Sequence, residues 1–200
     1  YKYQEKLPES MQNKIPKDQF IVGYAGTIGN ANAMETLLES ISYLNDTDIY
    51  ICILGDGPLK ETYEQKYASD QLIFLGKTEK EKVQDFLSHC DLLVNTWHPS
   101  KLYRYGVSPN KWIDYMYARK PIIVAYDGFQ SIINEAGCGE FIEAENPKLL
   151  AEKIKAYSKK SKEELEEIGL RGKRYLEDHL SLDILAEKYS ELFEETIMDK

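Results

Sequence analysis

Cationic side chains gather in one stretch of this 200-residue chain, between positions 101 and 120. The stretch contains a single carboxylate, that of Asp114. Its cations are Lys101, Arg104, Lys111, Arg119 and Lys120. The stretch therefore has a net charge of +4, whereas the whole chain has a formal net charge of −9. A basic island in an acidic protein is typical of a local anion site, and a diphosphate would suit it.

A helix is expected to begin inside this stretch. Ser108 is a favoured N-cap residue and Pro109 is a favoured first helical residue. Unpaired N–H groups at such a helix start, from Asn110 onward, can bind phosphate oxygens, and the Lys111 ammonium adds a full charge. Asp114 follows Lys111 by three residues and lies on nearly the same face. The alternative for this pair is a surface ion pair that contributes only about 0.2–0.5 kcal/mol.

A long polar and aromatic segment, residues 95–107, leads into this helix. Long loops in compact domains are usually functional. His98 could act as a catalytic base, but the sequence suggests no carboxylate partner. A contact with substrate or within the loop is therefore the expected role of His98. Trp97 and Tyr103 could stack on a sugar or a base, or could pack the loop itself.

Two turns rich in glycine are further candidates, GTIG at 26–29 and GDGP at 55–58. Glycine lets the backbone come close to a ligand, and a helix that follows such a turn can offer N–H groups to a phosphate. The spacing of Gly23, Gly26 and Gly29 does not match the dinucleotide fingerprint G-x-G-x-x-G. Both turns are also explained as tight turns without a ligand.

The elements that carry these candidates alternate between strand and helix. The apolar runs lie at 20–25, 49–54, 72–75, 92–94 and 121–126. Each run is continuously apolar, which indicates a strand buried on both faces. Helical patterns separate the runs, and the candidate turns follow the carboxyl ends of the runs. This order predicts a doubly wound parallel α/β sheet with a ligand outside the carboxyl ends of its strands.

The first residues of three helices are marked in the sequence. Pro58 suits a first helical position. Thr78 with Glu81 and Ser161 with Glu164 match the capping box, in which a hydroxyl and a carboxylate bind each other's backbone N–H. Helices are expected to end near residues 88 and 178 for these two boxes. Further helices are expected at 146–157 and 182–197, with no strand beyond residue 145.

The composition excludes several classes of protein. A net charge of −9 disfavours binding to nucleic acid or to anionic lipid. No apolar run approaches the roughly 20 residues that span a bilayer, and the first residues do not read as a signal peptide. The three scattered cysteines and the lack of a metal-ligand cluster indicate reduced, buried thiols in a cytoplasmic protein.

Five motifs follow one another along the chain, and their order as well as their residues is informative. They are FIVGYAGTIGN from Phe20, ILGDGP from Ile53, FLGK from Phe74, SPNKWIDYM from Ser108 and KPII from Lys120. Together they resemble the C-terminal, donor-binding domain of retaining family 4 glycosyltransferases, which is one half of the GT-B architecture. The likeness covers residues 20–198. The SPNK version resembles the branch that acts in bacterial surface polysaccharide synthesis.

The resemblance implies a UDP-sugar site. Asp114 matches the family carboxylate, usually Glu, that binds the ribose hydroxyls. Lys111 would contact the diphosphate opposite turn 26–29 and would act in catalysis, while backbone at Gly76 and Lys77 would meet the base. The residues expected to contact the donor are Gly26, Thr27, Gly29, Gly55, Gly76, Lys77, His98, Arg104, Gly106, Ser108, Pro109, Asn110, Lys111 and Asp114. No cofactor and no metal are expected.

The chain departs from the family pattern at two places. The family has a second Glu that contacts the donor sugar, and this chain has Gly106 there. The Arg and Lys that usually follow the first strand are replaced by a stretch with Thr27, Asn30 and Asn32. These departures would suit a deoxy or N-acetylated donor sugar.

The resemblance also implies a separate N-terminal domain that binds a glycan or lipid-linked acceptor. Residues 1–19 are expected to be the linker to it, residues 20–180 the donor domain, and residues 181–200 an amphipathic helix that crosses back. The isolated domain is then expected to be inactive, and the missing domain could bring the protein to the inner face of the membrane. The alternatives are a non-catalytic nucleotide-sugar-binding subunit and a UDP-sugar epimerase with the GT-B fold.

Overall fold

The computed structural model describes residues 4–45, 47–107 and 109–198. Within these residues the chain forms a six-stranded sheet in the order β3-β2-β1-β4-β5-β6, and all neighbouring strands are parallel. The strands are β1 (Phe20–Ala25), β2 (Ile49–Leu54), β3 (Leu72–Gly76), β4 (Leu92–Thr96), β5 (Ile122–Ala125) and β6 (Gly139–Ile142). The prediction of a doubly wound parallel α/β sheet is confirmed.

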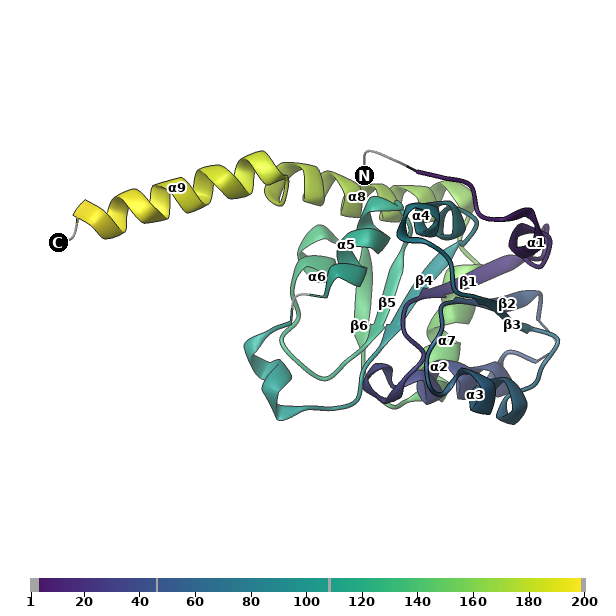
Figure 1. Cartoon of the computed structure of the whole chain (residues 1–200). Coiled ribbons are helices and arrows are strands. Elements are labelled where there is room, and N and C mark those ends of the chain that lie inside the picture. Colours follow the sequence, from purple (N-terminus) through teal and green to yellow (C-terminus); the bar gives the residue numbers. More distant parts are fainter. Residues whose placement is uncertain (1–3, 46, 108, 199–200) are drawn as a thin grey trace.

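Helices cover both faces of this sheet (Figure 1). One face packs against α2 (Met34–Ser40), α3 (Lys60–Lys66) and α7 (Pro147–Ser158). The other packs against α4 (Lys80–Ser88), α5 (Asn110–Tyr117), α6 (Ile132–Ala136) and α8 (Lys162–His179). The remaining helices are α1 (Glu9–Gln12), α9 (Leu182–Met198) and the 3-10 turns η1 (Asn30–Asn32), η2 (Ile41–Tyr43) and η3 (Lys101–Tyr105).

Strand β1 shows why the apolar runs are continuous. Val22 and Tyr24 point into the core shared with α2 and α7, whereas Ile21 and Ala25 point into the core shared with α4 and α5. Successive residues of a strand face opposite sides of the sheet, so a central strand of a two-faced sheet needs apolar residues at every position. The sequence order changes direction between β1 and β4, which is where doubly wound sheets open a crevice for ligands.

Four features of the expected helices and strands differ in the structure. Strand β6 was not predicted, because its sequence GEFI forms an edge strand with only Ile142 buried. Helix α3 begins at Lys60 rather than at Pro58. The Thr78 capping box is absent from the described residues, since the Thr78 hydroxyl donates to the Glu79 side chain instead of accepting from the helix. Helix α5 begins at Asn110, with Pro109 as its N-cap residue.

The capping box at the start of α8 is confirmed. The Ser161 hydroxyl accepts the N–H of Glu164 at 3.2 Å, and the Glu164 carboxylate accepts the N–H of Ser161 at 2.7 Å. Helices α7 and α9 also lie where the sequence places them. Cys52, Cys90 and Cys138 are free thiols buried in the core, as expected.

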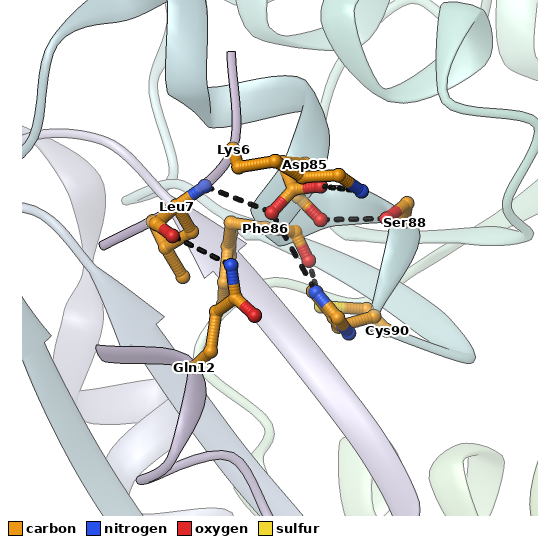
Figure 2. Close-up of polar contacts among 8 residues, drawn as sticks. Lys6, Leu7, Gln12, Asp85, Phe86, Ser88 and Cys90 are labelled. Atoms are coloured by element: carbon orange, nitrogen blue, oxygen red, sulfur yellow. Dashed lines mark hydrogen bonds and ion pairs between the residues drawn. The ribbon is translucent and has the colours of Figure 1, made fainter. Parts of the chain in front are cut away.

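The described part of the segment before β1 packs against the domain. Leu7 and Ile15 are buried in the core under α4. The Asp85 carboxylate of α4 accepts the N–H of Leu7 and the ammonium of Lys6, each at 2.9 Å (Figure 2). The backbone N–H of Glu5 donates to the carbonyl of Glu81 at 3.0 Å. Any linker role of residues 1–19 therefore starts from a segment that is tied to α4.

The C-terminal helix α9 continues beyond α8 and extends away from the sheet (Figure 1). Several large apolar side chains on it are exposed, and those are Leu182, Tyr189, Leu192 and Phe193. Among the described residues, no helix has both the length and the apolar character needed to cross a membrane.

Candidate functional site

A cavity of about 480 Å³ opens at the carboxyl ends of β1, β2 and β3, next to the start of α5. This is the edge of the sheet where the sequence predicts the ligand. The residues predicted from the sequence that line the cavity are Gly26, Thr27, Gly55, Lys77, Lys111 and Asp114. The sequence therefore brings six of its candidate residues to one place.

The two glycine turns form the back wall of this cavity by lying against each other. The N–H of Gly26 donates to the carbonyl of Leu54 at 3.0 Å, and that of Ile28 donates to the carbonyl of Asp56 at 2.9 Å. A Cβ placed on Gly55 would lie 1.9 Å from the carbonyl oxygen of Gly26. Glycine at position 55 is thus required by the contact between the turns, whether or not a ligand binds.

Lys111 extends from the first turn of α5 to the end of β1. Its ammonium donates a hydrogen bond to the Tyr24 hydroxyl at 3.0 Å and lies 4.1 Å from the centre of the Tyr24 ring. A Cβ on Gly26 would come within 2.9 Å of the same ammonium. Burial lowers the pKa of Lys111 to about 7, because a cation loses its hydration there. A diphosphate in the cavity would meet this cation beside the Gly26 backbone.

Asp114 also lines the cavity, one turn further along α5. Its carboxylate forms an ion pair with Lys80 of α4, and the Asp114 side chain is 14% exposed. Burial raises the pKa of Asp114 to about 6 even with this cation beside it. The ion pair between Lys111 and Asp114, which the sequence left open, is replaced by two separate partners, Tyr24 and Lys80. A carboxylate in this position can accept hydrogen bonds from ligand hydroxyls.

The charged lining of the cavity favours an anion. Its cations are Lys77, Lys80 and Lys111, and its carboxylates are Asp56 and Asp114. Since Lys80 already pairs with Asp114, the remaining charges leave an excess of positive charge toward the end of β1. Among the described residues, no group of three or more His, Cys, Asp or Glu side chains is arranged to hold a metal ion.

Several residues of the cavity lining were not among the predicted donor contacts, although Asp56 lies in the candidate turn 55–58 and Asn32 was noted as a departure from the family. They are Ala25, Asn32, Leu54, Asp56, Thr78, Lys80, Val83 and Tyr115. Lys80 and Val83 lie in the first turns of α4, which follows β3, so their place after a carboxyl strand end was a usable signal. Tyr115 is buried in the core, and nothing in its sequence context distinguishes it from any other core aromatic.

Other predicted residues do not line the cavity within the described part of the chain. Those are Gly29, Gly76, His98, Arg104, Gly106, Pro109 and Asn110. Gly29 and Gly76 belong to the turns around it, and the carbonyl of Gly76 accepts the N–H of Gly55 at 2.8 Å. Ser108, the predicted N-cap residue, lies outside the described residues.

The segment between β4 and α5 is folded on its own aromatic side chains. The rings of Trp97 and Tyr103 meet edge to face with centroids 5.1 Å apart. The Tyr126 hydroxyl donates to the carbonyl of Tyr103 at 2.9 Å. Of the two roles that the sequence left open for Trp97 and Tyr103, packing of the loop is the one seen here.

His98 has a carboxylate partner that the sequence did not reveal. Its Nδ1 lies 2.6 Å from Oε1 of Glu145, and both side chains are about half exposed. Glu145 follows β6, the strand that was not predicted, so the pairing could not be expected from the sequence. The pair lies at the carboxyl edge of the sheet, outside the residues that line the cavity.

Fold and cavity together define the class of protein: a Rossmann-like α/β domain with a cation-lined site at the switch point of its sheet. The family model described as "Glycosyl transferases group 1" matches residues 6–175. The chain therefore belongs to this glycosyltransferase family. No curated protein matches the chain.

Solved structures share the fold. The C-terminal domain of the glycosyl transferase group 1 family protein LpcC from Francisella tularensis is 16% identical, with a TM-score of 0.68 over 90% of this chain and 96% of that one. Anabaena HepE, solved in complex with UDP-glucose, is 14% identical, with a TM-score of 0.70 over 96% of this chain and 54% of HepE. Sucrose-phosphate synthase from Thermosynechococcus elongatus is 17% identical, with a TM-score of 0.73 over 100% of this chain and 51% of the synthase.

The aligned regions show how much of each solved protein corresponds to this chain. It spans nearly all of the LpcC domain but about half of HepE and of sucrose-phosphate synthase. The predicted Rossmann-like half of a GT-B architecture is thus confirmed at the level of the fold.

Proposed function

We propose that this chain is the donor-binding domain of a retaining glycosyltransferase that uses a UDP-sugar. Membership of the glycosyl transferases group 1 family supports glycosyl transfer, and HepE, which has the same fold, binds UDP-glucose. The observation that carries the proposal is the place of Lys111, whose ammonium lies beside the Gly26 backbone at the carboxyl edge of β1. A pyrophosphate at this point would contact both.

In the proposed complex the donor lies along the cavity from α4 to α5. The base lies near Lys77 and Val83, and the Asp114 carboxylate accepts the ribose hydroxyls. The diphosphate lies between turn 26–29 and the first turn of α5. As the bond between the sugar and the diphosphate breaks, negative charge grows on the leaving diphosphate, and Lys111 with the N–H groups of α5 stabilises it. The acceptor oxygen bonds to the anomeric carbon on the face that the diphosphate leaves, and the proton of the acceptor hydroxyl passes to the departing diphosphate.

The acceptor would bind to a second domain. The chain spans only about half of HepE and of sucrose-phosphate synthase, which leaves room for such a domain in a longer protein. The exposed apolar side chains of α9 are the surface proposed to pack against it, among them Leu192 and Phe193. We place the transfer in polysaccharide synthesis in the cytoplasm, with the acceptor domain at the membrane and the isolated chain inactive in transfer.

Calorimetric titration of the 200-residue chain with UDP tests the proposal. The wild-type chain is expected to bind UDP, and Lys111→Met is expected to bind it about 10- to 100-fold more weakly, because a charge-assisted hydrogen bond is lost. Lys66→Met is the matched control, since Lys66 also lies over a tyrosine ring, that of Tyr67, but outside the cavity. Absence of UDP binding by the wild-type chain would contradict the proposal.

A non-catalytic nucleotide-sugar-binding subunit is the second candidate. Gly106 favours it, because this chain has glycine where the family has the glutamate that contacts the donor sugar. Within the described residues, a Cβ built on Gly106 has no neighbour within 4 Å, apart from the residues next to it in the chain. Transfer assays of the longer protein with a panel of UDP-sugars separate the two functions, since only the enzyme releases UDP in the presence of an acceptor.

A further inference from the structure

The Tyr24 hydroxyl lies at the carboxyl edge of the sheet, next to turn 26–29. The Tyr24 side chain is completely buried in the core shared with α2 and α7. Lys111 reaches the same point from α5, which covers the opposite face. The two side chains meet over Gly26, where a Cβ would lie 2.9 Å from the Lys111 ammonium and 3.2 Å from the Tyr24 hydroxyl.

The hydrogen bonds of Tyr24 have a defined direction. Its hydroxyl donates to the carbonyl of Thr27 at 2.8 Å, so its oxygen is left as an acceptor for the Lys111 ammonium at 3.0 Å. Asn32 donates to the same Thr27 carbonyl at 3.0 Å, which fixes the turn from a second side. An ammonium has three N–H donors, and Tyr24 takes one of them. Within the described part of the chain, two donors of Lys111 are left for a ligand.

Lys111 has no ion pair among the described residues. A carboxylate partner would neutralise the ammonium and would compete with a phosphate for it. A neutral hydroxyl and the face of an aromatic ring stabilise a cation without neutralising it, and the Lys111 ammonium has both. The arrangement therefore leaves the charge of the protonated ammonium unneutralised inside a largely buried site.

We propose that Tyr24 is the positioning residue for Lys111: its hydroxyl and ring hold the ammonium over Gly26 so that two N–H donors face the diphosphate of the ligand. This inference rests on the function proposed above for the cavity. Tyr24 acts through Lys111 and contacts no reacting atom itself.

Tyr24 is expected to affect the charge of Lys111 as well as its position. Burial already lowers the pKa of Lys111 to about 7, and an acceptor bonded to the ammonium favours its charged form. Removal of the Tyr24 hydroxyl is therefore expected to lower the pKa of Lys111 further. Burial raises the pKa of Tyr24 itself, which keeps the phenol neutral.

The remaining titratable side chains that line the cavity are Asp56, Lys77, Lys80, Asp114 and Tyr115. Lys80 is another cavity cation whose pKa burial lowers, and it pairs with Asp114. Burial raises the pKa of Tyr115 and sets that of Asp114 near 6, so the phenol stays neutral and the carboxylate stays ionised at higher pH. A change in diphosphate affinity between about pH 7 and 9 is assigned to Lys111 if the wild-type chain shows it and Lys111→Met does not.

A comparison of UDP and uridine binding by Tyr24→Phe distinguishes the loss of Lys111 positioning from a general loss of folded protein. At about pH 8 the variant is expected to bind UDP about tenfold more weakly than the wild-type chain, because Lys111 must take up a proton to bind the diphosphate and the variant lacks the hydrogen bond that favours the charged ammonium. Uridine, which lacks the phosphates, is expected to bind both proteins within twofold. Tyr63→Phe is the matched control: it removes another buried phenol hydroxyl, bonded to Glu35 at 2.5 Å and outside the cavity, and leaves UDP binding unchanged.

Equal UDP affinities of Tyr24→Phe and the wild-type chain would overturn the proposal, and so would an equal loss of UDP and uridine binding. A wild-type chain that binds no UDP would instead contradict the proposed function. The pKa of Lys111, measured without ligand by the NMR titration of its side-chain carbon next to nitrogen, tests the inference in that case. An identical pKa in the wild-type chain and in Tyr24→Phe would refute it.

If Tyr24→Phe does not fold, the wild-type chain still tests the inference. The ring carbon of Tyr24 that carries the hydroxyl is expected to shift at the same pH at which Lys111 loses its proton. Separate inflections for the two residues would overturn the proposal.

Discussion

The side-chain oxygen of Asn95 accepts the indole N–H of Trp112 at 2.8 Å, and this bond ties the end of β4 to helix α5. The same oxygen accepts the indole N–H of Trp97 at 2.7 Å. Asn95 and Trp112 are completely buried. One carboxamide therefore fixes both the helix that carries Lys111 and the segment that leads into it.

Asn95→Leu is expected to lower the free energy of unfolding by about 1–3 kcal/mol, because the buried N–H of Trp112 loses its acceptor. Urea unfolding followed by tryptophan fluorescence measures this loss. The double variant Asn95→Leu with Trp112→Phe is expected to lose less than the sum of the two single variants, since the buried indole N–H of Trp112 is no longer left without its acceptor. Additive losses would show that the bond does not hold α5.

The two glycine turns give a matched pair of substitutions. Gly55→Ala would bring a Cβ to 1.9 Å from the carbonyl oxygen of Gly26, and it is expected to lower the free energy of unfolding by about 2 kcal/mol or more. Gly29→Ala meets no atom closer than 3.7 Å at an extended backbone, so it is expected to change stability by no more than about 0.5 kcal/mol. Thermal unfolding of both variants checks the pair, and equal losses would contradict the stacked turns.

The sequence predicted the fold well where burial sets the pattern. Five of the strands are continuous apolar runs because both faces of the sheet are covered, and α8 is marked by a capping box that the backbone uses. Strand β6 carries no such signal, because a partly exposed edge strand needs few apolar residues. The Thr78 motif failed because a short polar side chain has several local partners, and here Glu79 is the partner.

The site was predictable in part for the same reason. Gly26, Lys111 and Asp114 lie at strand and helix ends whose place follows from the order of elements. The partners of these residues do not follow from that order. Tyr24 looks like any strand aromatic, and Lys80 like any exposed helix cation, until the sheet brings β1, α4 and α5 together. Pairings of this kind depend on side-chain directions across elements.

Lys111 is expected to lower the stability of the ligand-free chain. Its folded-state pKa, about 7, lies below the ordinary lysine pKa of 10.5, so between these pH values the unfolded chain binds more protons. Stability is therefore expected to rise as pH increases through this range. Lys111→Met is expected to raise the free energy of unfolding at about pH 7 by at least about 1 kcal/mol and to make the rise smaller.

Urea unfolding of the ligand-free chain at several pH values tests this expectation. Lys66→Met is again the control, because it removes a cation outside the cavity. A decrease in stability in Lys111→Met would mean that the ammonium is well solvated or well paired.

Asp114 is expected to make the binding of a neutral nucleoside depend on pH. The pKa of its carboxyl is raised to about 6, so the carboxylate is ionised at about pH 7.5 and mostly protonated at about pH 5. A carboxylate accepts hydrogen bonds from ribose hydroxyls more strongly than a carboxylic acid does, so uridine affinity should fall about three- to tenfold over this range. Uridine carries no phosphate, which removes the charge of Lys111 from the comparison.

Asp114→Asn should bind uridine weakly at both pH values. Asp70→Asn, which changes an exposed acid outside the cavity, should behave as wild type. Uridine affinity that stays constant in the wild-type chain would remove Asp114 from the ribose site.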